Sequence, residues 1–386
     1  MLDFVFHNPT KIIFGKGKIS KLGEEIVPYS RRILLVYGEG SIKRNGIYYQ
    51  VVDILKESGI EYKELSGVKP NPRLDSVREG IKLCREHSLD MVLAVGGGSV
   101  IDCAKIIAAG FFYDGDPWDF FTRKAKIEKA LPIGAVLTLA ATGSEMNGNA
   151  VISNDETKAK KGVGSSHLLP KFSILDPLLT CTVPPLQTAA GVADIMSHVF
   201  EQYFSANEGA YLQDRIAESV LKTCIHYAPI ALKEPENYEA RANLMWASTI
   251  ALNGILSTGK LTDWATHMIE HEVSALYDIA HGVGLAILIP YWMEYVLDEQ
   301  TVGKFAAYAI NVWGVTGNNE WEMAKEGIGK TRAFFKALGL PSRLNEVGIQ
   351  REDLEIMAEK AVTDEELGRF KKLNRQDVLS ILKNAF

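Results

Sequence analysis

The sequence predicts a two-domain protein, in which an α/β domain built on a parallel sheet precedes an all-helical domain. In the first 183 residues, short apolar runs alternate with helical patterns, which is typical of parallel strands joined by crossover helices. Beyond Pro184 and Pro185, which restrict the backbone and lack N–H donors, long helical patterns dominate. The length of 386 residues also favours two domains over one. We therefore expect domains at residues 1–183 and 184–386.

Five predicted strands are short apolar runs flanked by Gly, Pro or Asp, at residues 11–14, 33–37, 91–95, 135–139 and 172–175. Helical patterns lie between them, at residues 46–58, 74–87 and 99–109. In the second domain, similar patterns cover residues 188–204, 212–227, 238–252, 263–276, 301–313, 321–338 and 351–361.

Composition excludes several classes of protein. The net charge of −6 argues against a broad nucleic-acid surface. No run approaches 18 uninterrupted apolar residues, and the N-terminus lacks the pattern of a secretory signal, so we expect no membrane span. Four isolated cysteines, Cys84, Cys103, Cys181 and Cys224, form no C-x-x-C motif and suggest buried, reduced thiols. These features predict a cytoplasmic protein.

A glycine-rich turn follows the strand at 91–95. The sequence Gly96-Gly97-Gly98-Ser99 leads directly into a helical pattern. Glycines let the backbone approach an anion, and the free amides and dipole at a helix N-terminus favour negative charge. The spacing differs from G-x-G-x-x-G, so a tight structural turn is the alternative. Asp102, in the first turns of the helix, could simply stabilise it.

A second glycine turn, Gly38-Glu39-Gly40-Ser41-Ile42-Lys43, follows the strand at 33–37. In nucleotide-binding folds the tip of this strand meets the adenosine ribose. Ser41 and Lys43 could hold a 2′-phosphate and so favour NADP over NAD, whereas Glu39 would repel that group. An ordinary surface loop is the alternative.

A third polar segment lies at the carboxyl end of the strand at 135–139. It runs from Thr138 to Thr142-Gly143-Ser144-Glu145. Hydroxyl groups and a glycine at this position suit ligand binding in an open α/β sheet, although a structural turn remains the alternative.

A metal site is predicted from one acid and four histidines. Asp194 and His198 are four residues apart in a helical pattern, and His267 and His271 repeat that spacing, so the members of each pair share a helix face. His281 precedes two glycines, which suggest a helix break or close packing. Such ligands suit Fe²⁺ or Zn²⁺, with one coordination position left open in a catalytic site. Five candidates exceed the need, and capping or core histidines are the alternative for each.

These motifs resemble the metal signature of the iron-containing (group III) alcohol dehydrogenases, in the spacings Asp194-x-x-x-His198, His267-x-x-x-His271 and His281-Gly-Val-Gly. Residues 96–102, 142–145 and 69–72 resemble that family's cofactor motifs. Residues 37–46 and 232–238 are most similar to its butanol dehydrogenase and NADPH aldehyde reductase branch. The resemblance covers nearly the whole chain.

The resemblance implies a dehydroquinate-synthase-like fold, with a dinucleotide-binding first domain and a metal-binding second domain. It implies Fe²⁺ or Zn²⁺ held by Asp194, His198, His267 and His281, with His271 near the nicotinamide as a proton relay. It places NADP or NAD along Asn71, Gly97, Gly98, Ser99, Asp102, Thr138, Thr142, Ser144, Asn149 and Lys160, in addition to Gly38, Gly40 and Ser41 of the second glycine turn. Close aldehyde-reductase relatives carry glycine where this chain has Glu39, which speaks against NADP.

The implied activity is hydride transfer between NAD(P)(H) and a small primary alcohol or aldehyde, such as butanol or butanal, in a homodimer or larger homo-oligomer. Two other functions fit parts of the sequence. A dehydroquinate-synthase-like lyase would need a basic cluster beside the metal, but residues 260–284 contain only Lys260 among Lys and Arg. A non-catalytic metal- or nucleotide-binding protein would bind both ligands without turnover.

Overall fold

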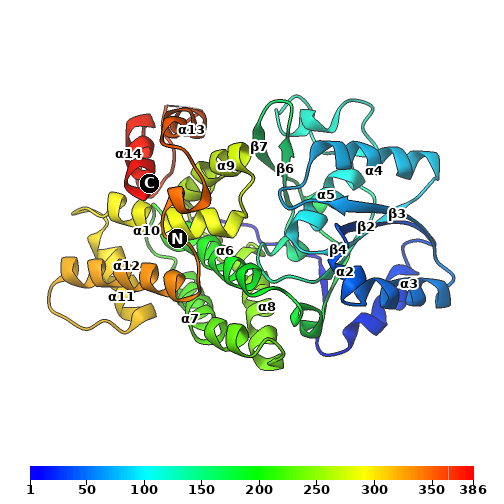
Figure 1. The fold of residues 1–386 in the computed structure, drawn as a ribbon, viewed down its shortest axis with the longest axis horizontal. Coiled ribbons are helices and arrows are strands. Elements are labelled where there is room, and N and C mark those ends of the chain that lie inside the picture. Colours follow the sequence, from blue (N-terminus) through cyan, green and yellow to red (C-terminus); the bar gives the residue numbers. More distant parts are fainter. Residues whose placement is uncertain (364) are drawn as a thin grey trace. The chain divides into compact units, whose positions relative to one another are not determined.

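The computed structural model describes residues 1–363 and 365–386 and divides the chain into two compact units (Figure 1). The first, here called the sheet unit, comprises His7–Val183 and Pro235–Thr249. The second, the helical unit, comprises Met1–Phe6, Pro184–Glu234 and Ile250–Phe386. The units thus differ from the expected domains in two segments, the first six residues and residues 235–249.

The sheet unit contains a six-stranded parallel sheet in the order β1-β8-β5-β4-β2-β3. Its strands are β1 (Lys11–Phe14), β2 (Arg32–Gly38), β3 (Glu61–Val68), β4 (Met91–Gly96), β5 (Ile133–Leu137) and β8 (Phe172–Leu175). Every residue of β4 and β5 is buried, as expected for central parallel strands covered on both faces. The predicted fold class, an α/β region with a parallel sheet followed by a helical region, is confirmed.

Helices cover both faces of this sheet, and Figure 1 shows α4 and α3 on opposite sides of it. Alternate residues of each strand therefore enter separate cores. Leu34 and Val92 pack in the core that includes α4 and α5, whereas Ile33 and Leu93 pack in the core that includes α1 and α3. The helices are α1 (Leu22–Ile26), α2 (Ser41–Arg44), α3 (Ile47–Glu57), α4 (Leu74–Glu86) and α5 (Gly98–Gly110).

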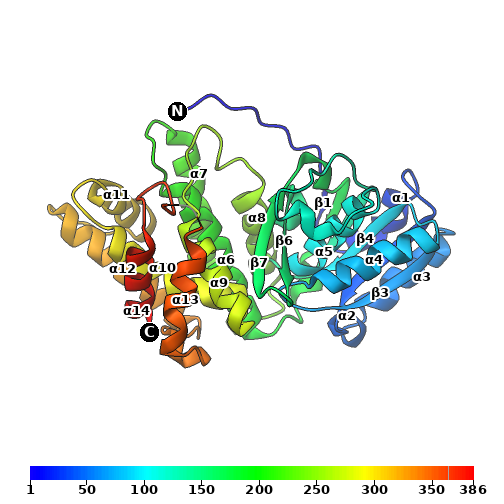
Figure 2. The same ribbon diagram turned by 90° about the horizontal axis from the view of Figure 1, so that it is seen from above.

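Three strands were not predicted. The edge strand β3 reads Glu-Tyr-Lys-Glu-Leu-Ser-Gly-Val and buries only two of its eight residues. The antiparallel pair β6 (Asn149–Asn154) and β7 (Ala159–Gly164) forms a separate two-stranded sheet beside α5 (Figure 2). Both regions are rich in Lys, Glu, Asn and Gly, which have weak strand propensity, so the pairing of neighbouring segments decides their conformation.

The helical unit consists of packed helices around an aromatic core. Phe204 lies at its centre, with its ring 4.5 Å from the Phe305 ring and 5.9 Å from the Trp292 ring. Among the described residues, no helix is both long enough and apolar enough to cross a membrane. The helices are α6 (Pro185–Tyr203), α7 (Tyr211–Lys233), α9 (Ala265–Tyr277), α10 (His281–Val296), α11 (Val302–Trp313), α12 (Glu320–Ala337), α13 (Leu354–Ala361) and α14 (Arg375–Ala385), while most of α8 (Tyr238–Leu252) belongs to the sheet unit.

Helix α10 was not predicted, because it contains Pro290 and begins His-Gly-Val-Gly. Proline and glycine each disfavour a helix interior by roughly 1–3 kcal/mol. Nearly all of α10 is buried, so tertiary packing outweighs these local preferences.

The four cysteines are free thiols that differ in burial. Cys84, Cys103 and Cys224 are buried, and burial raises the pKa of the Cys84 and Cys224 thiols to about 12. Cys181 is partly exposed. Because thiolates are the reactive form, we predict that iodoacetamide at mildly alkaline pH labels at most Cys181 in the native protein. In denaturant, all four should react. Intact-mass spectrometry counts the adducts.

The control is Cys181→Ser, which should acquire no adduct under native conditions. Rapid native labelling of Cys84 or Cys224 would contradict the burial of these thiols.

Candidate metal centre and cofactor site

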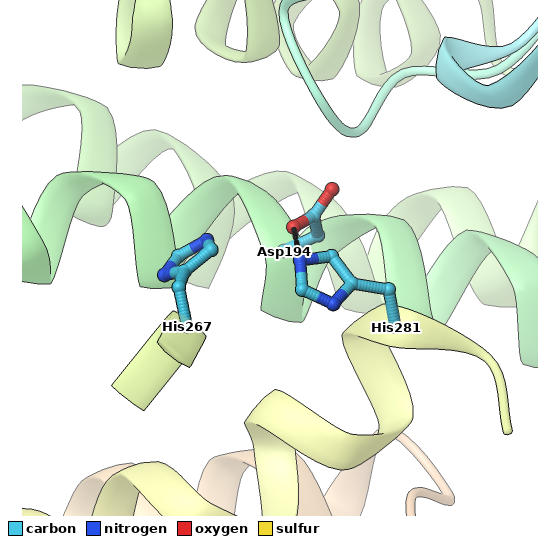
Figure 3. A group of neighbouring side chains, drawn as sticks. All are labelled: Asp194, His267 and His281. Atoms are coloured by element: carbon cyan, nitrogen blue, oxygen red, sulfur yellow. Dashed lines mark ion pairs between the residues drawn. The ribbon is translucent and has the colours of Figure 1, made fainter. Parts of the chain in front are cut away.

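Three helices bring the predicted metal ligands together. Asp194 and His198 lie one turn apart on α6, His267 and His271 lie one turn apart on α9, and His281 is the first residue of α10. Figure 3 shows Asp194, His267 and His281 extending from three separate helices toward one another. The i, i+4 spacing identified in the sequence therefore places both members of each pair in one region.

Asp194, His267 and His281 each offer one donor atom, and these three atoms lie within 4.8 Å of one another. His281 Nε2 is 3.8 Å from Asp194 Oδ1. Among the described residues, buried His267 Nε2 has no hydrogen-bond partner. An unpaired buried polar atom costs about 1–3 kcal/mol, so a nitrogen of this kind facing other donors is explained by a cation. The donor set, one carboxylate with imidazoles, fits Fe²⁺ or Zn²⁺.

His198 lies beside this group but outside the 4.8 Å set. Its Nδ1 is 3.7 Å from Asp194 Oδ1, and its ring centre is 4.8 Å from that of His267. Burial, reinforced by the neighbouring His267 and His281, holds the pKa of His198 well below its usual range. The neutral imidazole is the form that binds metals. The role of His198 as a ligand stays a prediction.

Two buried glutamates behind the histidines were missed in the sequence. Glu201 Oε1 is 2.9 Å from His267 Nδ1 and accepts the His267 backbone N–H at 3.0 Å. Glu270 Oε2 contacts His281 Nδ1. A carboxylate on Nδ1 fixes the ring so that Nε2 faces the metal position. Helical spacing could have indicated both glutamates. Glu201 is seven residues after Asp194 and Glu270 is three after His267, so each shares a helix face with a predicted ligand.

His271, on α9, lies beside His281. Its donor atom, one from Glu270 and one from His281 form a second set within 4.8 Å. Its ring centre is 5.6 Å from that of His281, and it is buried. The structure thus brings together all five predicted candidates and places His271 next to His281 of the predicted ligand set.

The glycines after His281 permit close helix packing, as the sequence suggested. A Cβ atom on Gly282 would lie 2.0 Å from the Ala190 carbonyl oxygen of α6. One on Gly284 would lie 2.8 Å from the Glu270 side chain of α9. Any larger residue would displace α10, and His281 with it, from the other two helices.

The three predicted cofactor loops lie at one edge of the sheet. They follow β2, β4 and β5, which are neighbours and parallel, so their carboxyl ends coincide. The chain order reverses between β2 and β4, and such switch points bind ligands in open α/β sheets. Gly97 caps α5, so the first-turn amides of this helix open at that edge.

The loop after β5 packs directly on the glycine turn. A Cβ atom on Gly98 would lie 2.2 Å from Thr142 Oγ1. Farther along α5, Asp102 accepts hydrogen bonds from the Ser144 hydroxyl at 2.5 Å and from the Val151 N–H at 2.9 Å. Asp102 therefore joins α5 to this loop and to β6, beyond any effect on its own helix.

Comparison with known proteins identifies the family. Residues 9–177 match the iron-containing alcohol dehydrogenases, and residues 188–386 match the C-terminal domain of the same family. The chain belongs to the iron-containing alcohol dehydrogenase family. The predicted resemblance is confirmed, and the protein is an NAD(P)-dependent oxidoreductase.

Individual relatives are similar over most or all of their length. NADH-dependent butanol dehydrogenase A of Clostridium acetobutylicum is 57% identical over the whole of both chains. An NADPH-dependent aldehyde reductase of Escherichia coli is 44% identical over 93% of each chain. The crystal structure of NADH-dependent butanol dehydrogenase A from Thermotoga maritima is 47% identical, with a TM-score of 0.96, and the match covers 100% of this chain and 99% of that one.

Other predicted cofactor residues of this iron-containing dehydrogenase gather around β6 and β7. Asn71 is buried with a φ of 52° in the segment after β3. The Ser153 N–H donates to the Pro72 carbonyl, and Ser153 pairs with Lys160 across the hairpin. Lys160 is buried while Lys161 is exposed, so these two adjacent lysines have different surroundings. Asn149 begins β6.

The loop after β2 bears on the choice between NAD and NADP. Glu39 is exposed, and Ser41 begins the short helix α2. Lys43 Nζ lies 4.5 Å from the centre of the Tyr48 ring and 5.0 Å from that of Tyr37. This ammonium thus has aromatic partners within the protein, and cation–π contacts of this kind contribute about 0.5–1 kcal/mol at exposed sites.

We predict that His267→Ala and His281→Ala each abolish stoichiometric metal binding, because each removes a donor atom from the cluster. Turnover should fall by roughly a hundredfold or more, since catalysis by a bound metal is lost with it. Elemental analysis of the purified protein gives the metal content. His271→Ala serves as the contrast and should keep the metal while changing the rate. Loss of metal from that variant would make His271 a ligand.

We predict that Glu201→Gln weakens metal binding by about 10- to 100-fold, because the amide orients the His267 ring less well than the carboxylate. Competition with a fluorescent chelator measures the affinity. Glu218→Gln is the matched control, since Glu218 is also a buried acid but bonds Tyr203 instead of a histidine. Equal effects of the two substitutions would contradict a specific role for Glu201.

Proposed function

We propose that this chain transfers hydride between NAD(P)(H) and a small primary alcohol or aldehyde, with butanol and butanal as representative substrates. The observation that carries the proposal is the cluster of Asp194, His267 and His281, in which a carboxylate supports each of the two imidazoles. The cluster belongs to a chain whose relatives include butanol dehydrogenases and an aldehyde reductase.

In the proposed site, Asp194, His198, His267 and His281 hold Fe²⁺ or, alternatively, Zn²⁺. Such an ion, when bound, acts as a Lewis acid toward the substrate oxygen. Glu201 and Glu270 accept hydrogen bonds from the protonated Nδ1 atoms of His267 and His281. Each Nε2 therefore carries no proton and stays available as a metal ligand. A ring nitrogen of His271 exchanges the hydroxyl proton with solvent.

The cofactor is proposed to lie along the carboxyl edge of the sheet. The first-turn amides of α5, from Gly97 to Ser99, bind its pyrophosphate. Polar groups farther along this edge orient the remainder of the cofactor, so that hydride moves between fixed positions. These contacts are assigned to Gly38, Gly40, Ser41, Asn71, Asp102, Thr138, Thr142, Ser144, Asn149 and Lys160.

The lyase alternative is disfavoured by the position of Lys260. Its ammonium donates to Asp214 Oδ1 and to the Gln202 carbonyl oxygen, and only 1% of its side chain is exposed. A residue held in this way does not supply the basic cluster that a phosphorylated, carboxylated substrate requires.

Three further features are part of the proposal. Residues 1–183 form the cofactor domain and residues 184–386 the metal domain. The chain works in the cytoplasm, and it assembles as a homodimer or a larger homo-oligomer. Light scattering after size-exclusion chromatography measures the last of these directly.

The test of function is aldehyde-dependent loss of the near-ultraviolet absorbance of reduced nicotinamide. Protein reconstituted with Fe²⁺ is assayed with butanal, and NADPH and NADH are compared in parallel. We expect turnover that a chelator removes and that added Fe²⁺ restores. The ratio of the rates with NADPH and NADH measures the cofactor preference, which we assign to Glu39, Ser41 and Lys43 together.

Metal-loaded protein that turns over no aldehyde or alcohol with either cofactor would overturn the proposal. Turnover that survives complete removal of metal would overturn the role given to the histidine cluster.

A further inference from the structure

Lys105 is a fully buried lysine on α5, the helix that follows the glycine turn. Its ammonium donates to the Ser144 hydroxyl at 2.7 Å, to Asn147 Oδ1 at 3.1 Å and to the Asn149 carbonyl oxygen at 2.8 Å. An ammonium has three protons, so these bonds use all of them. Buried lysines are rare because desolvation penalises the charge, and burial lowers the pKa of Lys105 to about 8.

The acceptors of Lys105 belong to one short segment, residues 144–149, that closes around it. Asn147 Oδ1 also accepts the Asn149 N–H at 2.9 Å, and Asn147 Nδ2 donates to the Gly143 carbonyl oxygen at 2.9 Å. A single side chain of the phosphate-binding helix thereby fixes the conformation of the loop beside it.

A chain of contacts leads from Lys105 to the glycine turn. The Ser144 hydroxyl accepts from Lys105 and donates to Asp102, while the Ser144 N–H donates to Thr142 Oγ1 at 3.2 Å. Thr142 in turn packs against Gly98. Loss of the ammonium would therefore release the loop that holds the Thr142 hydroxyl against Gly98 of the glycine turn.

We propose that Lys105 is a positioning residue of the nicotinamide-cofactor site, which holds Thr142, Ser144 and Asn149 in place against helix α5. The proposal rests on the cofactor-binding role given above to these residues. Lys105 acts through them, because its own protons are already used by the protein.

The charges around Lys105 explain why a lysine serves here. Asp102 and the fully buried Glu145 face its ammonium, and Lys160 faces Asp102 from β7. Without Lys105, Asp102 and the buried Glu145 would lose this counter-charge, and three acceptors would lose their donor. A carbon side chain of the same length would fill the space but satisfy none of these groups.

The test compares Lys105→Met, Lys105→Arg and Cys103→Ala. Cys103 is also fully buried on α5 and, within the described residues, donates no hydrogen bond to residues 142–149, so it controls for a general loss of packing. The cofactor probe is NADH, titrated without substrate and followed by quenching of tryptophan fluorescence. We expect Lys105→Met to raise the dissociation constant about tenfold or more, with Lys105→Arg intermediate and Cys103→Ala within about twofold of the wild type.

Two further readouts separate positioning from general damage. At saturating cofactor, kcat of Lys105→Met should stay within about threefold of the wild type, since the increase in KM carries the defect. The metal content should be unchanged. A dissociation constant for Lys105→Met near the wild-type value, or an equal loss in Cys103→Ala, would overturn the proposal.

Amide hydrogen exchange in the cofactor-free protein keeps this test independent of the proposed function. Lys105→Met should accelerate exchange over residues 143–151 more than Cys103→Ala does. If the wild type binds no nicotinamide cofactor, the proposed function fails, and Lys105 then has no cofactor site to position. If the wild type binds NADH and exchange in Lys105→Met is unchanged, the positioning role alone is overturned.

Discussion

The helical unit depends on buried carboxylates that face imidazoles. The Glu201 carboxylate bonds four groups at the start of α9, which are the Trp264 and His267 N–H groups, the Thr266 hydroxyl and the His267 ring. It therefore sets where that helix begins as well as how the ring is turned. Glu270 does the same for the ring at the start of α10. Burying two acids is unfavourable unless their charge is shared. The histidines supply the partners, and a divalent ion at their opposite nitrogens would complete the compensation.

The sheet unit follows a related principle with the opposite sign of charge. Here a buried ammonium, Lys105, supports a loop, and the glycines of the turn would let a ligand come close to backbone amides. In both units the groups that would contact a ligand are short or rigid. The charged side chains that hold these groups, such as Glu201 and Lys105, are buried behind them. This arrangement keeps the ligand-facing atoms in place before binding, which reduces the ordering cost of association.

The sequence predicted what local patterns decide. The strands at 11–14 and 172–175 and the helix at 238–252 have the predicted bounds, because apolar periodicity and turn residues agree there. Helix α10 and the polar hairpin of β6 and β7 depend on packing that no local window contains. The same limit applies to the site. Histidines at helical spacing could be grouped, whereas Glu201, Glu270 and Lys105 resemble solvent-facing charges until burial shows otherwise.

The sequence offers five candidate metal ligands, one more than a site needs, and residue spacing does not show which one is not a ligand. The surroundings of His281 bear on this question. His281 belongs to both donor clusters, but its two nitrogens face different neighbours. Nδ1 contacts Glu270, whose other oxygen accepts from Ser274, so a cation among Glu270, His271 and His281 would have to break both contacts. Nε2 faces Asp194, and one donor atom of His267 lies within 4.8 Å of the donor atoms of both residues. The hydrogen bonds therefore favour the proposed metal position between Asp194, His267 and His281, and leave His271 beside it, where its proposed role is that of a proton relay.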